Sequence, residues 1–186
     1  MSVRRIRLLA GVLGLSFVMG AGAEAGFLTR LDYKLHSWRA DYRVDKLVVT
    51  GNFVKSRLLA ELIQRKTRQP LLLVSPTAAG ADLYFLPYGQ QAERLSMDEL
   101  VEFVDLADPR QIVFLGGQNY IPSSVVERLQ DRKPSVRVGS ENWAQNAKTL
   151  SNMFEYRKLP EKFARYMRKV ANTADLPPDS MEEITY

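Results

Sequence analysis

The chain has 186 residues, a formal net charge of +5 and no cysteine. Without cysteine it has no thiol nucleophile, no zinc ribbon and no thiolate ligands for an iron-sulfur cluster. Part of the positive charge lies at the very start of the chain, and the rest mixes both signs, so a nucleic-acid partner is not expected. The length suits one domain with a sizeable core and short extensions.

Residues 1–25 have the layout of a secretory signal peptide. Closely spaced arginines precede an uncharged apolar run, and the segment closes on Ala23-Glu24-Ala25, a small-x-small pattern suited to signal peptidase. The apolar centre is shorter than the roughly 20 residues of a comfortable membrane span. We therefore predict an exported protein, periplasmic or associated with the cell envelope. Retention of the segment as an uncleaved anchor is the alternative.

Residues 26–43 mix aromatic and aliphatic side chains with basic ones, as at Phe27, Leu31 and Trp38. This spacing predicts an amphipathic arm that covers apolar surface of the following domain. A peripheral contact of the arm with a membrane or a polymer is the alternative.

Residues 44–157 alternate hydrophobic strands with amphipathic helices. Strands are predicted at 46–49, 71–74, 111–115 and 136–138, and each of them ends near a small polar turn that leads into the next segment. Strands that alternate with helices indicate a parallel sheet with crossover helices. The predicted fold class is α/β, a three-layer sandwich in which helices flank a short parallel sheet of about four strands.

The helices between these strands carry start and stop signals. Ser96 and Glu99 form a capping box, and helices are expected to end before Pro70 and before Pro109 because the residue preceding a proline disfavours the helical conformation. Residues 75–94 show no clear period and are predicted to form a long irregular loop. A small extra strand in that segment is the alternative.

The end of the chain is predicted to form a helix and a tail. Residues 158–173 place Phe163, Tyr166 and Met167 on one apolar stripe, which predicts a C-terminal helix. Residues 174–186 contain two adjacent prolines and several acidic residues, and we predict a flexible tail.

Motifs of catalytic, metal and cofactor sites are missing from the sequence. There is no Gly-x-Ser-x-Gly elbow, no glycine-rich dinucleotide or Walker loop, and no histidine and aspartate cluster at metal spacing. The only histidine, His36, lies in the predicted arm. We predict a protein that is not an enzyme and has no cofactor or metal. A hydrolase of envelope precursors, with Ser75 or a carboxylate as the reacting group, is the less favoured alternative, and it would require Asp82 to lie beside Ser75 in a closed pocket.

Polar side chains and glycines gather where the predicted strands end. Ligands of parallel α/β sheets bind at the carboxyl ends of the strands, and the helix N-termini that follow attract anions. Two arginines could balance phosphate or carboxylate charge. The candidate ligand-binding residues are Thr50, Gly51, Asn52, Ser75, Gly116, Gly117, Asn119, Arg57 and Arg137. Such residues also occur in turns only to reverse the chain.

Four stretches carry a resemblance to a known family: 47–53 with its Gly-Asn-Phe turn, 69–76, 112–117 with its Gly-Gly ending, and 136–139. In order and spacing they resemble the cell wall-binding repeat 2 family, modules that attach secreted proteins to envelope polymers. The resemblance implies the α/β fold and binding of a cell-wall polymer. That family uses three tandem repeats and this chain shows one copy, which implies a homo-oligomer or extensions that cover the missing contacts.

We therefore expect an exported, non-enzymatic cell-envelope protein. It would bind a cell-wall polymer or an envelope protein through the carboxyl ends of its parallel strands. The alternative is a protein-protein interaction subunit of an envelope complex, which docks through the arm and the C-terminal helix.

Overall fold

The computed structural model describes residues 43–78 and 80–173. The predicted signal peptide, the predicted arm except Arg43, and the predicted tail lie outside the described residues. Within the described ranges, no helix combines the length and the apolar character needed to cross a bilayer.

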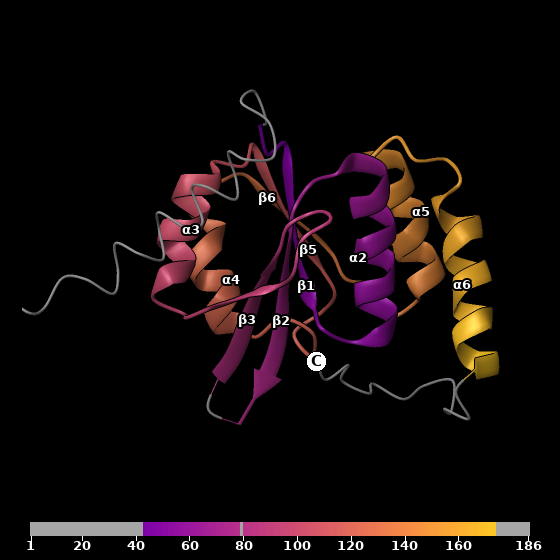
Figure 1. The fold of residues 1–186 in the computed structure, drawn as a ribbon, viewed down its shortest axis with the longest axis horizontal. Helices are drawn as coiled ribbons and strands as arrows, with labels where there is room; N and C mark the ends of the chain where they lie inside the picture. Colours follow the sequence, from indigo (N-terminus) through magenta and orange to yellow (C-terminus); the bar gives the residue numbers. More distant parts are fainter. Residues whose placement is uncertain (1–42, 79, 174–186) are drawn as a thin grey trace, which may run out of the picture.

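A sheet of six strands forms the middle layer of the described domain (Figure 1). Its spatial order is β4-β3-β2-β1-β5-β6; β2, β1, β5 and β6 run parallel, whereas β3 and β4 are antiparallel to their neighbours. The α/β class is confirmed, and the expected total of about four strands is wrong. The strands are β1 (Lys46–Gly51), β2 (Leu71–Thr77), β3 (Gly80–Leu86), β4 (Glu93–Leu95), β5 (Gln111–Leu115) and β6 (Ser135–Val138).

The two additional strands come from the segment that was expected to be an irregular loop. β3 pairs along the whole of β2, with Leu72 opposite Phe85 and Val74 opposite Leu83. Leu83 and Phe85 are buried on one face of β3, whereas Tyr84 and Leu86 on the other face are half-buried. Apolar residues therefore occupy consecutive positions and hide the period of two in the sequence. Pro76 lies past the last residue of β2 that pairs with β1, where a strand tolerates a missing amide.

Helices cover both faces of the sheet. α3 and α4 lie on one face, and α2, α5 and α6 lie on the other (Figure 1). The C-terminal helix α6 packs on both α2 and α5, so it lies in the same helical layer as these two helices. The helices are α2 (Val54–Thr67), α3 (Glu99–Ala107), α4 (Ser123–Gln130), α5 (Trp143–Met153) and α6 (Leu159–Thr173).

Each layer of helices encloses its own apolar core. Under α3 and α4, Phe103 packs against Phe85 with ring centroids 4.8 Å apart, and both side chains are fully buried. On the opposite face, Leu59 and Leu150 are fully buried with the alternate residues of the same strands. Strand residues point alternately to the two faces, so one sheet serves both cores.

The helix boundaries follow the signals in the sequence. The Ser96 N–H donates to the Glu99 carboxylate at 2.7 Å, and the Glu99 N–H donates to the Ser96 hydroxyl oxygen at 3.2 Å, so the capping box is confirmed. α2 ends with Arg68 in the left-handed conformation (φ 59°), and α3 ends with Asp108 likewise (φ 41°). Both helices therefore stop before the following proline, as expected.

The connections after β1 and β5 leave the sheet in opposite directions. β1 leads into α2 on one face, and the neighbouring β5 leads into α4 on the other. Divergence of this kind opens a crevice outside the carboxyl ends of the two strands. The fold thus places the best position for a ligand between β1 and β5.

Candidate functional site

A cavity of about 500 Å³ lies at this divergence, at the carboxyl ends of β1, β5 and β6. We call it the strand-end pocket. Three connections build it, those between β1 and α2, β5 and α4, and β6 and α5. Its lining residues are Phe53, Val54, Lys55, Gly117, Gln118, Asn119, Tyr120, Gly139, Ser140, Glu141 and Trp143.

Three aromatic rings, one from each connection, form a continuous wall of the pocket. Phe53 meets Tyr120 edge to face, with centroids 5.2 Å apart and planes at 84°. Tyr120 meets Trp143 at 5.1 Å and 67°. Edge-to-face pairs of this kind hold rings in defined orientations. The wall therefore presents ring surface to a ligand before the ligand arrives.

Amide and hydroxyl groups stand beside this wall. The Gln118 and Asn119 side chains are exposed and have no hydrogen-bond partner among the described residues. Ser140 is fixed by Asn146: the Ser140 N–H donates to Asn146 Oδ1 at 2.9 Å, and Asn146 Nδ2 donates to the Ser140 carbonyl at 2.7 Å. One rim of the pocket thus offers free amides, while the other is held rigid.

Two glycines allow the connections to approach one another closely. Gly116 has φ +115°, and a Cβ there would lie 2.7 Å from Cβ of Tyr120. A Cβ on Gly51 would lie 2.8 Å from both the Phe53 ring and the Tyr120 carbonyl oxygen. Both predicted residues therefore set the position of the aromatic wall, and their contribution is made through the backbone.

Three of the predicted ligand-binding residues have buried side chains that bond within the protein. Thr50 is fully buried, and its hydroxyl donates to the Leu115 carbonyl at 2.8 Å. Asn52 and Ser75 are 3% and 2% exposed, and Asn52 Nδ2 donates to the Ser75 hydroxyl oxygen at 3.1 Å. These bonds connect β1 to β5 and β2. The three side chains therefore stabilise the sheet and are not available to a ligand in the strand-end pocket.

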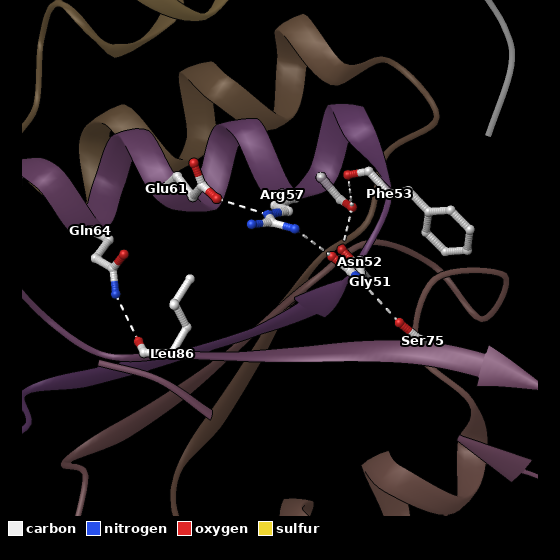
Figure 2. A network of polar contacts seen from close by, with 9 residues as sticks. Gly51, Asn52, Phe53, Arg57, Glu61, Gln64, Ser75 and Leu86 are labelled. Atoms are coloured by element: carbon white, nitrogen blue, oxygen red, sulfur yellow. Dashed lines mark hydrogen bonds and ion pairs between the residues drawn. The ribbon is translucent and has the colours of Figure 1, made fainter. Parts of the chain in front are cut away.

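Figure 2 shows how Arg57 extends this network along α2. Arg57 Nη1 donates to Asn52 Oδ1 at 3.2 Å, and its Nε donates to Glu61 Oε1 at 2.8 Å. The hydroxyl of Ser56 donates to the Gly51 carbonyl at 2.6 Å, which fixes the start of α2. Arg57 therefore lies away from the strand-end pocket, with its charge compensated by Glu61.

The remaining predicted residues divide between pocket and scaffold. Gly117 and Asn119 line the strand-end pocket. Arg137 Nη1 donates to the Gly116 carbonyl at 3.2 Å, and its guanidinium lies 5.7 Å from the centroid of the Phe114 ring. Arg137 thus steadies the Gly116 turn.

The structure also reveals lining residues that the sequence reasoning missed. Phe53, Tyr120 and Trp143 were not among the candidate ligand-binding residues, although each follows a strand within a few positions. That shared position after a strand was the available signal, because parallel strands bring their following residues to one edge of the sheet.

A second cavity, of about 780 Å³, lies between α2 and the β3–β4 turn. It combines ring surface from Tyr84 and Tyr88 with Arg57, Arg65 and Arg94. Arg94 Nη2 lies 2.5 Å from Asp82 Oδ1, and this hydrogen bond and charge raise the pKa of Arg94 above its ordinary value. Two of the three arginines in this cavity therefore have a carboxylate partner, since Arg57 also pairs with Glu61.

The described residues were also compared with the requirements of a metal site and of a serine nucleophile. No group of three or more histidine, aspartate or glutamate side chains in these ranges could hold a metal ion. Asp82 lies opposite Ser75 in the β2–β3 register, but its carboxylate pairs with Arg94, and the Ser75 hydroxyl accepts from Asn52. This arrangement supplies no base for the serine.

Comparison with known proteins gives no relative. No protein-family model, no curated protein and no solved structure matches the chain. The resemblance to the cell wall-binding repeat 2 family thus stays a prediction from the sequence.

Proposed function

We propose that the chain is a non-enzymatic binding protein of the cell envelope that holds a carbohydrate segment of a wall polymer in the strand-end pocket. The observation that carries this proposal is the wall of Phe53, Tyr120 and Trp143 beside the free amides of Gln118 and Asn119. Binding sites for small ligands combine apolar and aromatic surface with a few placed polar groups.

Carbohydrates suit this combination of groups. The apolar faces of sugar rings pack on aromatic rings, and each side-chain amide can donate and accept hydrogen bonds at neighbouring hydroxyls. The backbone at Gly117 and Gly139 carries no side chain, so a ligand can approach it closely. The pocket is large enough for a segment of a few sugar units, since ligand sites commonly span roughly 300–1,000 Å³.

The double variant Gln118→Ala with Asn119→Ala tests the pocket. Two lost hydrogen bonds at about 0.5–1.5 kcal/mol each should weaken binding by about five-fold to about 150-fold. The measurement is co-sedimentation of the protein with purified cell-wall sacculi, with and without their anionic polymers. Gln130→Ala with Asn152→Ala removes the same two side-chain types from exposed sites elsewhere and should bind as the unaltered protein does.

A third variant addresses the aromatic wall. Trp143→Leu keeps apolar bulk but removes the ring surface, so binding should fall while the melting temperature stays within a few degrees. Undiminished sedimentation of both pocket variants would rule out the strand-end pocket as the polymer site.

A further inference from the structure

A basic cavity lies at the opposite end of α2. The last turn of α2 meets the turn between α5 and α6 and encloses about 470 Å³. We call it the basic pocket. From Lys55 at the strand-end pocket to Arg65, the helix advances about 15 Å, so the two cavities are separate. The basic pocket is lined by Arg65, Lys66, Glu155, Tyr156, Arg157, Lys158 and Lys162.

The positive charge of the basic pocket is not compensated by the described carboxylates. None of its five cations forms an ion pair with a described Asp or Glu, and one of them, Lys162, lies 5.2 Å from the centroid of the Tyr156 ring. Glu155 is the one carboxylate in the lining. A concave surface with this charge balance concentrates anions.

The turn that carries Arg157 and Lys158 is held rigid. The Tyr156 N–H donates to the Ser151 carbonyl at 2.8 Å, and the Ser151 hydroxyl donates to the Tyr156 carbonyl at 3.0 Å. Tyr156 and Leu159 on either side are 9% and 0% exposed. Because both flanking residues are anchored in the core, the backbone of Arg157 and Lys158 is held in place while their side chains are exposed.

We propose that the basic pocket binds a ligand with two or more closely spaced phosphate groups. The net positive charge of five cations and one carboxylate is larger than the negative charge of a single phosphate group. A ligand with one phosphate would therefore leave the site strongly positive. Arginine forks match phosphate oxygens in pairs, and lysines add point charges. The basic pocket and the strand-end pocket share no lining residue, so neither proposal depends on the other.

Titration calorimetry of the protein with tripolyphosphate tests this proposal. Binding should be saturable and at least tenfold tighter than that of orthophosphate. The triple variant Arg65→Gln, Arg157→Gln, Lys158→Gln should lose at least tenfold in affinity. The matched control Arg128→Gln, Arg132→Gln, Lys133→Gln makes the same charge change on α4 and the residues after it, where each cation has a carboxylate partner, and should stay within twofold.

A second measurement does not depend on any variant. Amide chemical shifts at 155–162 should move on addition of tripolyphosphate, while those at 117–120 should not. Equal losses in both triple variants, shifts confined to the strand-end pocket, or equal affinity for polyglutamate would each overturn the proposal. Binding to phosphatidylglycerol vesicles without binding to tripolyphosphate would also overturn it, and would point to a membrane surface.

Discussion

The two helical layers use their basic residues in different ways. Beside the sheet face covered by α3 and α4, Arg132 lies 3.2 Å from Asp105, Arg128 lies 3.4 Å from Asp98, and Lys133 pairs with Asp108. On the other face, the basic pocket gathers cations from α2 and from the α5–α6 turn beside one carboxylate.

This contrast shows that the role of a surface cation depends on the element packed against it. α3 and its flanking residues bring aspartates to meet α4 and the residues after it, so the cations there link two helices. α2, the α5–α6 turn and the start of α6 bring cations close to one another, and their repulsion costs stability unless an anion binds between them. The first arrangement serves the fold, and the second favours binding.

The largest expected effect tests whether both layers are equally part of the fold. Phe103→Ala should lower the free energy of unfolding by about 3–5 kcal/mol and Leu150→Ala by about 2–5 kcal/mol, because each empties a fully buried site. Urea denaturation measures both. A cost below about 1 kcal/mol for Leu150→Ala alone would mean that the layer with the basic pocket is loosely attached.

Removal of one hydroxyl tests the rigidity of the basic turn. Ser151→Ala leaves the Tyr156 carbonyl without its side-chain donor and should cost about 1–3 kcal/mol. Tripolyphosphate binding should weaken with it, since the turn loses one of its two ties. Ser124→Ala, an exposed hydroxyl on α4, is the control and should change neither the unfolding midpoint nor the affinity.

Removal of the carboxylate partners of Arg128 and Arg132 tests the contrast from the other side. Asp98→Asn with Asp105→Asn removes the partners of Arg128 and Arg132 and should cost roughly 0.2–1 kcal/mol per exposed pair. Calorimetry should then detect a second, weaker site for tripolyphosphate. If no second site appears, unpaired cations alone are insufficient for tripolyphosphate binding, and the concave shape of the basic pocket is also required.

The smallest expected effect is a pH dependence. The hydrogen bond and charge of Lys133 lower the pKa of Asp108 below its ordinary value. A lowered pKa gives stability that is present above the ordinary aspartate pKa of about 4 and is lost as the pH falls through the lowered value. The urea midpoints of the protein and of Asp108→Asn should therefore differ slightly at pH 7 and converge as the pH falls below the lowered pKa of Asp108. A constant difference across this range would contradict the pairing.

Much of the parallel sheet could be predicted from the sequence. The run at 111–115 is a strand, and the left-handed residues Arg68 and Asp108 end their helices before the prolines. Such features are local, because a hydrophobic run and a proline act within a few residues of themselves. β3 could not be predicted in the same way, since its half-buried face carries the apolar residues Tyr84 and Leu86 and so hides the alternation in the sequence.

The candidate site was less predictable than the fold. Thr50 and Asn119 are both polar residues after or near the end of a strand, yet Thr50 bonds to the Leu115 carbonyl in the interior and Asn119 lines the pocket. Which of the two occurs depends on the neighbouring strand, which lies far away in the sequence. The aromatic wall has the same origin, because its rings come from three distant connections.

The two outer strands of the described sheet bear on how copies of this protein could associate. β4 has three residues and β6 has four, with Arg137 exposed on β6. Short edges that carry a charge offer little for a second chain to extend by strand pairing. Growth of the sheet from one copy into the next is therefore disfavoured at both of these edges.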